Sequence, residues 1–175
     1  MRPNHNISFD QANSLLANAQ PLSGAYVSGE IKIEAYDSWE KEVIMKNCTL
    51  EYFSGSATQF KKPVHLVDCY FKKCQFVFSY FLGGLIIENC IFDDYLDFQA
   101  GGHNKNGNPV ILANNQFAGF VNFFDCWYES EIIIKNNDFK KGANLLGKPF
   151  GIPVTFDVVP IIEDNKGQLG LDTEG

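Results

Sequence analysis

The residues best suited to chemistry are the adjacent aspartates Asp93 and Asp94, followed by Asp97 and the dipeptide Gly102–His103. Two carboxylates that flank a glycosidic bond can serve as general acid and general base. We therefore consider Asp93, Asp94, Asp97 and His103 as candidate catalytic residues of a carbohydrate-active enzyme.

Other features of the sequence weigh against catalysis there. Asp93–Asp94 are expected to lie opposite Lys72–Lys73 of the preceding repeat, so these charges already have structural partners. Arg2 is the only arginine, which weakens any proposal that needs a bidentate clamp on carboxylate or phosphate. Cysteines that stack in a line do not give the tetrahedral geometry of a zinc site, and we predict neither a metal nor a cofactor.

Polar and aromatic residues further along the chain suit binding rather than catalysis. Sugars hydrogen-bond to amides and lie against aromatic faces. Four residues hold equivalent places in successive repeats, namely Gln75, Asp97, Asn122 and Asn144. We predict a carbohydrate-binding strip there, and the candidate exposed aromatics are Tyr80, Tyr95, Trp127 and Tyr128. The alternative is a hydrogen-bonded ladder of amides with aromatic rings packed at the corners.

The polar loop Gly101–Pro109, which contains His103, is the other candidate binding site. A loop that projects from a regular repeat is a frequent place for function. Its Gly, Asn and His residues suit either the binding of a partner or a simple turn of the chain.

An internal repeat decides where these residues lie. The copies begin 21, 21, 25 and 22 residues apart, and the long interval contains the loop Gly101–Pro109. Five segments align: Val43–Leu50, Val64–Phe71, Leu85–Phe92, Val110–Phe117 and Ile132–Phe139. Val159–Lys166 is a degenerate sixth copy, and Tyr26–Ile33 is a partial first coil. This period fits a coil of two or three short strands, with neighbouring coils about 4.8 Å apart.

The segments IIIKNNDF and LIIENCIF resemble the right-handed parallel β-helix repeat of pectate-lyase-like proteins, over about residues 43–140. The stretch Cys69–Phe76 also resembles pentapeptide repeats, but the later coils lack that pattern. The first resemblance implies an all-β, right-handed parallel β-helix of about six coils, and it says little about activity. Asp93–Asp94 and Gly102–His103 are similar to elements of polygalacturonase-like glycosidases, whose Asn-x-Asp and Arg-x-Lys elements have no counterpart here.

Equivalent positions of a solenoid stack into columns. We predict that one polar column forms hydrogen bonds along the axis, and that a neighbouring column of Cys and Asn is structural and semi-buried. The polar column is Asn47, Asp68, Asn89, Asn114 and Asn136, and its neighbour is Cys48, Cys69, Cys90, Asn115 and Asn137. A third column, Leu50, Phe71, Phe92, Phe117 and Phe139, is expected in the core.

Strand alternation points one apolar column outward, and an apolar outer face of a parallel sheet is normally covered. This column, the predicted interface, consists of Ile44, His65, Ile86, Ile111 and Ile133. Either a second subunit or the C-terminal segment Phe150–Ile162, folded back, is the expected cover.

Composition narrows the function further. The net charge of −7 disfavours nucleic acid as a partner, and no apolar run approaches the length of a membrane span. Five cysteines and no visible signal peptide predict a cytoplasmic location, although a trimmed sequence with an extracellular origin is not excluded.

We expect one domain over residues 1–175, with a capping helix at 8–20, coils at 25–165 and a flexible tail at 166–175. Its expected role is a non-enzymatic scaffold or binding module that acts through a lateral face on a protein or a glycan. The enzyme described above is the alternative.

Overall fold

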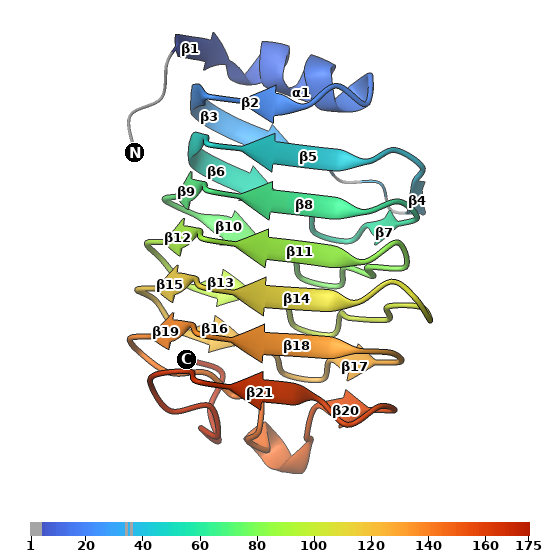
Figure 1. Ribbon diagram of the computed structural model, residues 1–175, viewed down its shortest axis with the longest axis vertical. Helices are drawn as coiled ribbons and strands as arrows, with labels where there is room; N and C mark the ends of the chain where they lie inside the picture. Colours follow the sequence, from blue (N-terminus) through green and yellow to red (C-terminus); the bar gives the residue numbers. More distant parts are fainter. Residues whose placement is uncertain (1–4, 34, 36) are drawn as a thin grey trace.

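The computed structural model describes residues 5–33, 35 and 37–175, and these form a parallel β-solenoid of about six coils (Figure 1). Arg2 lies outside the described residues. The longest strands stack into one sheet, in the order β2 (Leu22–Ser23), β5 (Val43–Lys46), β8 (Val64–Val67), β11 (Leu85–Glu88), β14 (Val110–Ala113), β18 (Ile132–Lys135) and β21 (Ile161–Glu163). We call this the main sheet.

The predicted register of the five repeats is confirmed. Val43 pairs with Val64, and Leu85, Val110 and Ile132 continue the same column. The predicted register of the sixth copy is wrong by one residue, because Ile161 and not Pro160 pairs with Ile133. A one-residue shift exchanges the inner and outer faces of a strand, so Ile161 continues the outward column.

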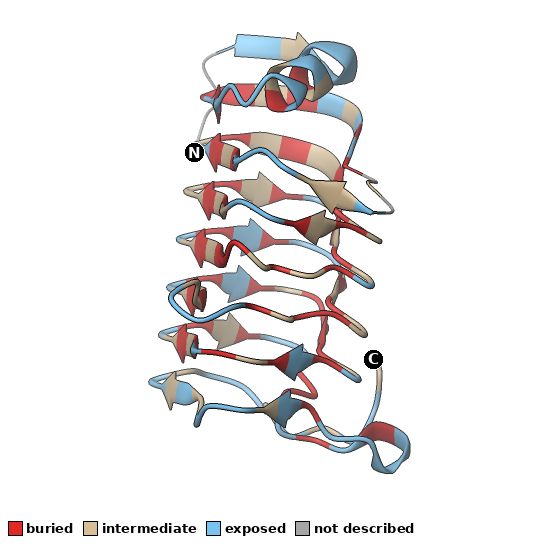
Figure 2. Cartoon of the chain, turned by 90° about the vertical axis from the view of Figure 1, so that its right-hand side faces the viewer, coloured by how far each residue is buried: buried red, intermediate tan, exposed pale blue. Residues whose placement is uncertain are grey.

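The rest of each coil is a second sheet that bends between short strands (Figure 2). Its strands are β1 (His5–Ser8), β3 (Ala25–Lys32), β6 (Thr49–Ser54), β9 (Tyr70–Phe71), β10 (Cys74–Gln75), β12 (Ile91–Phe92), β13 (Leu96–Asp97), β15 (Gln116–Phe117), β16 (Val121–Asn122) and β19 (Asp138–Phe139). Two short pairs lie at a further corner, β4 (Ser38–Trp39) with β7 (Gln59–Phe60), and β17 (Trp127–Tyr128) with β20 (Thr155–Phe156).

A left-handed residue turns the chain out of each main-sheet strand from β5 onward. These residues have φ between 53° and 57° and are Asn47, Asp68, Asn89, Asn114, Asn136 and Asp164. Asn and Asp tolerate this conformation better than most residues. The prediction that this column forms the axial hydrogen bonds is wrong, because the turn leaves its side chains half-buried or exposed.

The axial ladder lies one residue further along. The backbone N–H of Asn115 donates to Oδ1 of Asn137 (2.9 Å), and Asn137 donates in the same way to Asn165 (2.9 Å). In the earlier coils the Cys90 backbone N–H donates to Oδ1 of Asn115 (2.8 Å), and that of Cys69 donates to Sγ of Cys90 (3.4 Å). Thiols and amides therefore satisfy the same buried backbone donors.

Stacked phenylalanines fill the interior, as predicted. The ring centroids of Phe71 and Phe92 are 4.9 Å apart, those of Phe92 and Phe117 are 5.2 Å apart, and those of Phe117 and Phe139 are 4.8 Å apart. All four side chains are buried. A flat coil stacked in register places identical rings face to face, so this column unites the coils into one core.

Helix α1 (Phe9–Ala17) covers the first coil, and the predicted capping box is present. Ser8 Oγ accepts from the backbone N–H of Gln11 (3.2 Å), and the Gln11 side chain accepts from the Ser8 backbone (3.1 Å). Ala12 and Leu16 are buried against the solenoid. Within the described residues, no helix is long and apolar enough to span a bilayer.

The C-terminal region does not fold back over the outward column, which corrects one expectation. It continues the solenoid instead, through a 3-10 turn at Pro149–Gly151, then β20 and β21. The final residues, expected to fray, form hydrogen bonds to earlier coils. The Leu146 backbone N–H donates to Leu169 O (2.8 Å), and the Tyr95 hydroxyl donates to Glu174 O (2.7 Å).

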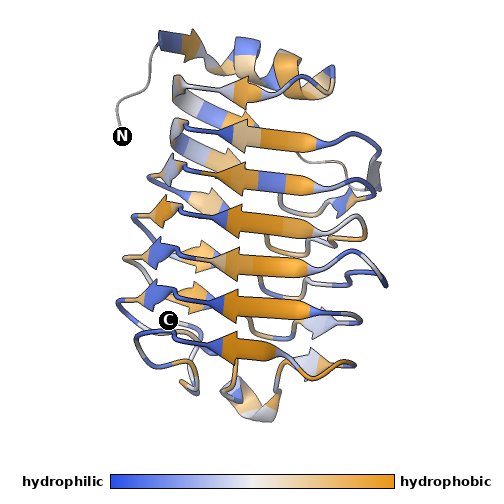
Figure 3. Cartoon of the chain, viewed as in Figure 1, coloured by the Kyte–Doolittle hydropathy of each residue, from blue (hydrophilic) through white to orange (hydrophobic). Residues whose placement is uncertain are grey.

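The strands of the main sheet are hydrophobic over most of their length (Figure 3). The outward column on the outer face of this sheet is partly exposed throughout and consists of Ile44, His65, Ile86, Ile111, Ile133 and Ile161. No described segment of the chain is paired across this face.

Candidate functional site

A cluster of side chains beside β17 combines three of the predicted binding residues, Tyr80, His103 and Trp127, with Lys105 of the predicted loop and with Glu129, to which the sequence did not point. Tyr80, Gly102 and Trp127 are bridged in consecutive coils, so their side of the solenoid forms one vertical column. The His103 ring lies between the two aromatic side chains. Its centroid is 4.2 Å from that of Tyr80 and 5.5 Å from that of Trp127. The Trp127 side of this column is open, since that residue is 44% exposed.

Glu129 joins the cluster from the next coil. Its Oε1 lies 2.8 Å from Nδ1 of His103, and its other oxygen accepts a hydrogen bond from Lys105 Nζ. The hydrogen bonds from Lys105 and His103 lower the pKa of Glu129. An ionised carboxylate only accepts, so His103 Nδ1 carries the shared proton, and in the neutral imidazole Nε2 is left as an acceptor. Within the described part of the chain, Nε2 has no hydrogen-bond partner.

Backbone geometry holds the histidine in this place. His103 has φ of 54°, and its backbone N–H donates to Trp127 O (2.6 Å). Gly102 has φ of 99°, and a Cβ added there would overlap the Trp127 carbonyl, so glycine is required at this close approach.

The predicted loop 101–109 is anchored by a residue that the sequence did not single out. Asn104 is fully buried. Its Nδ2 donates to Glu131 O (2.9 Å), while its Oδ1 accepts from the Ser130 backbone (3.3 Å). Asn108 Nδ2 donates to Leu82 O (2.8 Å). The loop is therefore tied to the coils on both sides of it, which places His103 and Lys105 reproducibly.

The predicted polar strip has its four residues in one column, but two of them are inside the molecule. Asn122 and Asn144 are fully buried, and Asn144 Nδ2 donates to Asn122 Oδ1 (2.6 Å). Asn122 Nδ2 donates in turn to Asp97 Oδ1 (3.0 Å). Gln75 accepts from the Tyr52 hydroxyl (3.1 Å). The alternative of a second amide ladder describes these contacts, and Asn122 and Asn144 offer no surface to a ligand.

The aspartates do not converge on His103. Asp97 accepts from the Gln99 backbone (2.9 Å) as well as from Asn122, and burial raises its pKa. Asp94 accepts from the Tyr95 backbone (2.8 Å). In the part of the chain that the structure describes, no hydrogen bond or ion pair links Asp93, Asp94 or Asp97 to His103.

The expected ion pairs across neighbouring coils are also missing at this corner. Among the described residues, neither Lys72 nor Lys73 forms an ion pair with Asp93 or Asp94. The predicted pairing of these lysines and aspartates is therefore wrong. Two residues lie between Phe71 and Cys74, whereas three lie between Phe92 and Leu96, so the turn gains one residue in the later coil.

The other predicted aromatics lie elsewhere. Tyr128 is buried and stacks on Phe156, with centroids 5.8 Å apart, so it is a core residue and not an exposed one. Tyr95 stacks on Phe120 at 6.1 Å and holds the C-terminal segment through its hydroxyl. Only Tyr80 and Trp127, of the four candidates, flank His103.

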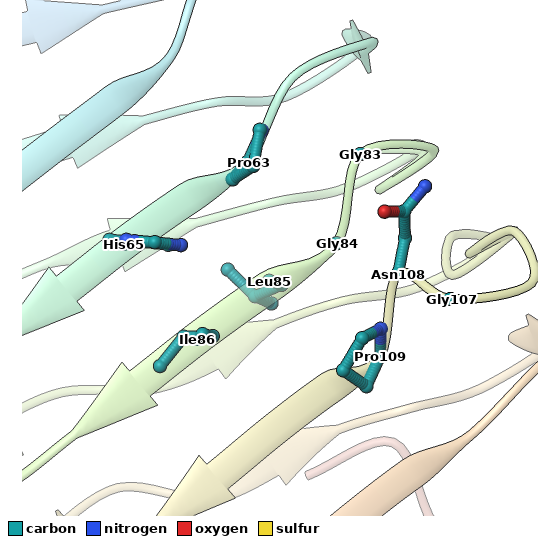
Figure 4. Close-up of a pocket in the computed structure, with 9 residues that line it drawn as sticks. All are labelled: Pro63, His65, Gly83, Gly84, Leu85, Ile86, Gly107, Asn108 and Pro109. Atoms are coloured by element: carbon teal, nitrogen blue, oxygen red, sulfur yellow. The ribbon is translucent and has the colours of Figure 1, made fainter.

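A small hollow of about 160 Å³ lies at the edge of the main sheet (Figure 4). His65 and Ile86 of the outward column line it, together with Pro63, Pro109 and the chain at Gly83–Gly84. Because residues of the outward column line it and no residue of the His103 cluster does, the hollow is part of the outer face of the main sheet.

The fold and site define a class of protein: a helix-capped parallel β-solenoid with a polar and aromatic cluster on one lateral side. Comparison of the chain with protein-family models, with curated proteins and with solved structures finds no match. The likeness to pectate-lyase-like and pentapeptide-repeat proteins thus has no family match behind it, and the evidence for the solenoid architecture is the internal repeat and the observed strand pairing. Among the described residues, no group of three or more His, Cys, Asp or Glu is placed to hold a metal ion.

Proposed function

We propose that this protein is a binding scaffold that holds a carbohydrate on its lateral face, at the cluster of Tyr80, His103, Trp127, Glu129 and Lys105. The observation that supports this proposal is the histidine held between two aromatic rings, one of them exposed, next to an ordered carboxylate.

Each group in the cluster matches a requirement of sugar recognition. The exposed face of Trp127 suits the apolar face of a pyranose ring, and its indole N–H is already fixed by Asp157 (2.9 Å). Sugar hydroxyls both donate and accept. Glu129 provides acceptors and Lys105 provides a donor, while Nε2 of His103 accepts in the neutral ring and donates in the protonated one. Because the loop is tied down at both ends, little conformational entropy is lost on binding.

The same geometry favours binding over hydrolysis. A general acid for glycosidic bond cleavage needs a raised pKa, whereas hydrogen bonds from Lys105 and His103 lower that of Glu129. Asp97 does have a raised pKa, caused first by burial, but its Oδ1 already accepts from Gln99 and Asn122, and among the described residues no hydrogen bond links it to Asp93 or Asp94. These contacts argue for the scaffold over the enzyme alternative based on Asp93, Asp94 and Asp97.

We also propose that the protein works in a reducing compartment such as the cytoplasm. The five cysteines are buried and free. Burial raises the pKa of Cys74 and that of Cys126, to about 12 for the latter, which keeps both as inert thiols.

Affinity electrophoresis in gels that contain xylan, mixed-linkage β-glucan, soluble chitin or polygalacturonate tests the function. Retention of the wild type by one of these polymers is expected, and Trp127→Ala should weaken it at least about tenfold, roughly 1.4 kcal/mol. Phe150→Ala is the matched control, because Phe150 is 85% exposed and lies outside the cluster.

Equal retention of both variants contradicts the proposed site. If no polymer retains the wild type, the proposal that the ligand is a carbohydrate is contradicted. Release of reducing ends by the wild type, abolished in Asp93→Asn, supports the enzyme alternative instead.

A further inference from the structure

We propose that the side of the solenoid around Asn144 is a docking site for an extended peptide of the pattern Leu-Asp-x-x-Gly, and that the chain's own residues 171–175 occupy this site in cis. The inference is independent of the carbohydrate site, which lies at the corner beside β17. It begins from the last residues of the chain, Leu171–Gly175, which run back over earlier coils (Figure 2). We call these residues the strap.

The strap lies on a column of polar residues whose earlier members reach solvent. Gln75 and Asp97 are partly exposed, whereas Asn122 and Asn144, which follow them in the same column, are fully buried. Asn144 Nδ2 donates to Thr173 O of the strap (2.9 Å). A buried amide needs a hydrogen-bond partner, and here a peptide carbonyl laid against the coils supplies it.

Other groups of the docking site hold the backbone of the strap. The Leu171 backbone N–H donates to Ala143 O (3.1 Å), and the Tyr95 hydroxyl donates to Glu174 O (2.7 Å). Burial raises the pKa of Tyr95 to about 12, so this hydroxyl keeps its proton at neutral pH and remains a donor. Main-chain bonds of this kind give affinity for an extended peptide, and side-chain contacts then give specificity.

The first two positions of the strap are read through their side chains. Leu171 is half-buried against Gly142 and Gly147, where an added Cβ would lie 2.6 Å from Leu171 Cδ1 and 2.1 Å from Leu171 O. Asp172 Oδ1 accepts from the Lys148 backbone N–H (2.7 Å). Two glycines thus leave room for a leucine, and the next position selects an acceptor side chain such as aspartate.

The last position requires glycine. Gly175 lies against the stacked rings of Tyr95 and Phe120, and an added Cβ would be 2.7 Å from the first ring and 2.9 Å from the second. Its φ of 104° also favours glycine. Thr173 and Glu174 contact the docking site through their carbonyls, so the pattern leaves these two positions open.

The strap is suited to exchange with a ligand from another protein. Asp172 and Thr173 are exposed. Burial and, secondarily, the charge of Glu174 raise the pKa of Asp97. Because these two carboxylates repel each other, a peptide with a neutral residue in place of Glu174 should bind more tightly than the strap's own sequence. The strap therefore acts as a built-in competitor that a better peptide can displace.

Fluorescence polarisation with a labelled peptide of the sequence 167–175 tests the proposal on the full-length chain. Leu171→Asp with Asp172→Ala releases the strap. Because a tethered segment competes at an effective concentration on the order of millimolar, the released variant should bind the peptide at least about tenfold more tightly than the wild type. Asp172→Ala alone changes one exposed side chain and should tighten binding in the same direction, which keeps the test open if the double variant does not fold.

Two comparisons in the released variant test the docking site itself. Tyr95→Phe removes the donor to Glu174 O and should weaken peptide binding. Tyr52→Phe is the matched control, because the Tyr52 hydroxyl donates to Gln75 (3.1 Å) instead. A peptide with Glu174→Gln should bind more tightly than the original, and one with Gly175→Val more weakly.

The outcomes that overturn the proposal are specific. A released variant that is folded by circular dichroism and does not bind the peptide shows that there is no docking site. Equal effects of Tyr95→Phe and Tyr52→Phe, or equal binding of the Gly175→Val peptide, show the same. If the wild type binds the peptide as tightly as the released variants do, the strap does not occupy the site in solution.

Discussion

Replacement of one buried asparagine provides a sharp test of how the coils are held together. Asn137 accepts from the backbone N–H of Asn115 (2.9 Å), and its Nδ2 donates to Leu112 O (2.8 Å). Asn137→Ala removes both contacts and leaves the buried Asn115 backbone N–H without its acceptor, whereas the Leu112 carbonyl lies within the paired strands β14 and β18. At about 1–3 kcal/mol for one unsatisfied buried group, the free energy of unfolding should fall by roughly 1–3 kcal/mol.

The chain contains its own control for this substitution. Cys90 occupies the same column two coils earlier, where its Sγ accepts from Cys69 N (3.4 Å) and donates to Leu66 O (3.3 Å). Asn137→Cys therefore keeps both contacts in weaker form, and its cost should be about half that of alanine.

Urea unfolding followed by far-UV circular dichroism measures both costs. If Asn137→Ala and Asn137→Cys lower the free energy of unfolding equally, volume and not hydrogen bonding stabilises the column. A loss below about 1 kcal/mol for alanine also refutes the reasoning, because it means that the backbone N–H finds water instead.

Three further outcomes are expected. Phe92→Ala, in the middle of the stacked rings, should cost about 3–5 kcal/mol in urea unfolding, and a loss below about 1 kcal/mol would show that the core collapses around the gap. Gly102→Ala should destabilise the fold by more than about 1 kcal/mol and shift Trp127 fluorescence, since its φ of 99° and the Trp127 carbonyl leave no room for a methyl group. Glu129 has a folded pKa below its unfolded value of about 4.3, so its contribution to stability is present above that value and is lost as the pH falls through the folded pKa. The wild type should therefore lose more stability than Glu129→Gln between neutral pH and acid, and parallel pH profiles would contradict this.

Most of the fold could be predicted from the sequence because one strand pattern recurs at nearly constant spacing. The predicted register of the last copy is wrong for a clear reason. In an apolar run such as Val159–Ile162, neighbouring residues can fill either face of the strand. Asp164 and Asn165 were the better guide, since they repeat the left-handed turn and the inward amide of Asn136 and Asn137.

The same turn explains why the ladder was assigned to the wrong column. A left-handed residue directs its own side chain outward and the next one inward, which strand alternation alone does not predict. Asn47 therefore faces outward, and Cys48 takes the buried place.

The candidate site could be predicted only in part. His103, Tyr80 and Trp127 were each chosen for their chemistry, but nothing in the sequence placed them together. Their meeting depends on which residues bridge between coils at the loop corner. Glu129 was missed because its contact with His103 joins residues 26 apart, through a loop whose path is set by buried Asn104.

Coils of unequal length are accommodated without loss of register, and the surplus emerges mainly beside the Tyr80–Trp127 column. The loop 103–109 adds residues there in one coil, and the segment 145–154, with its 3-10 turn, adds them in another. This corner therefore accepts inserted residues while the strands of the solenoid stay paired. Foreign peptides grafted between Lys105 and Gly107, where the chain is exposed, would be displayed at a fixed height along the solenoid. Deletion of a whole coil, in contrast, would lower every later feature by one strand spacing, about 4.8 Å.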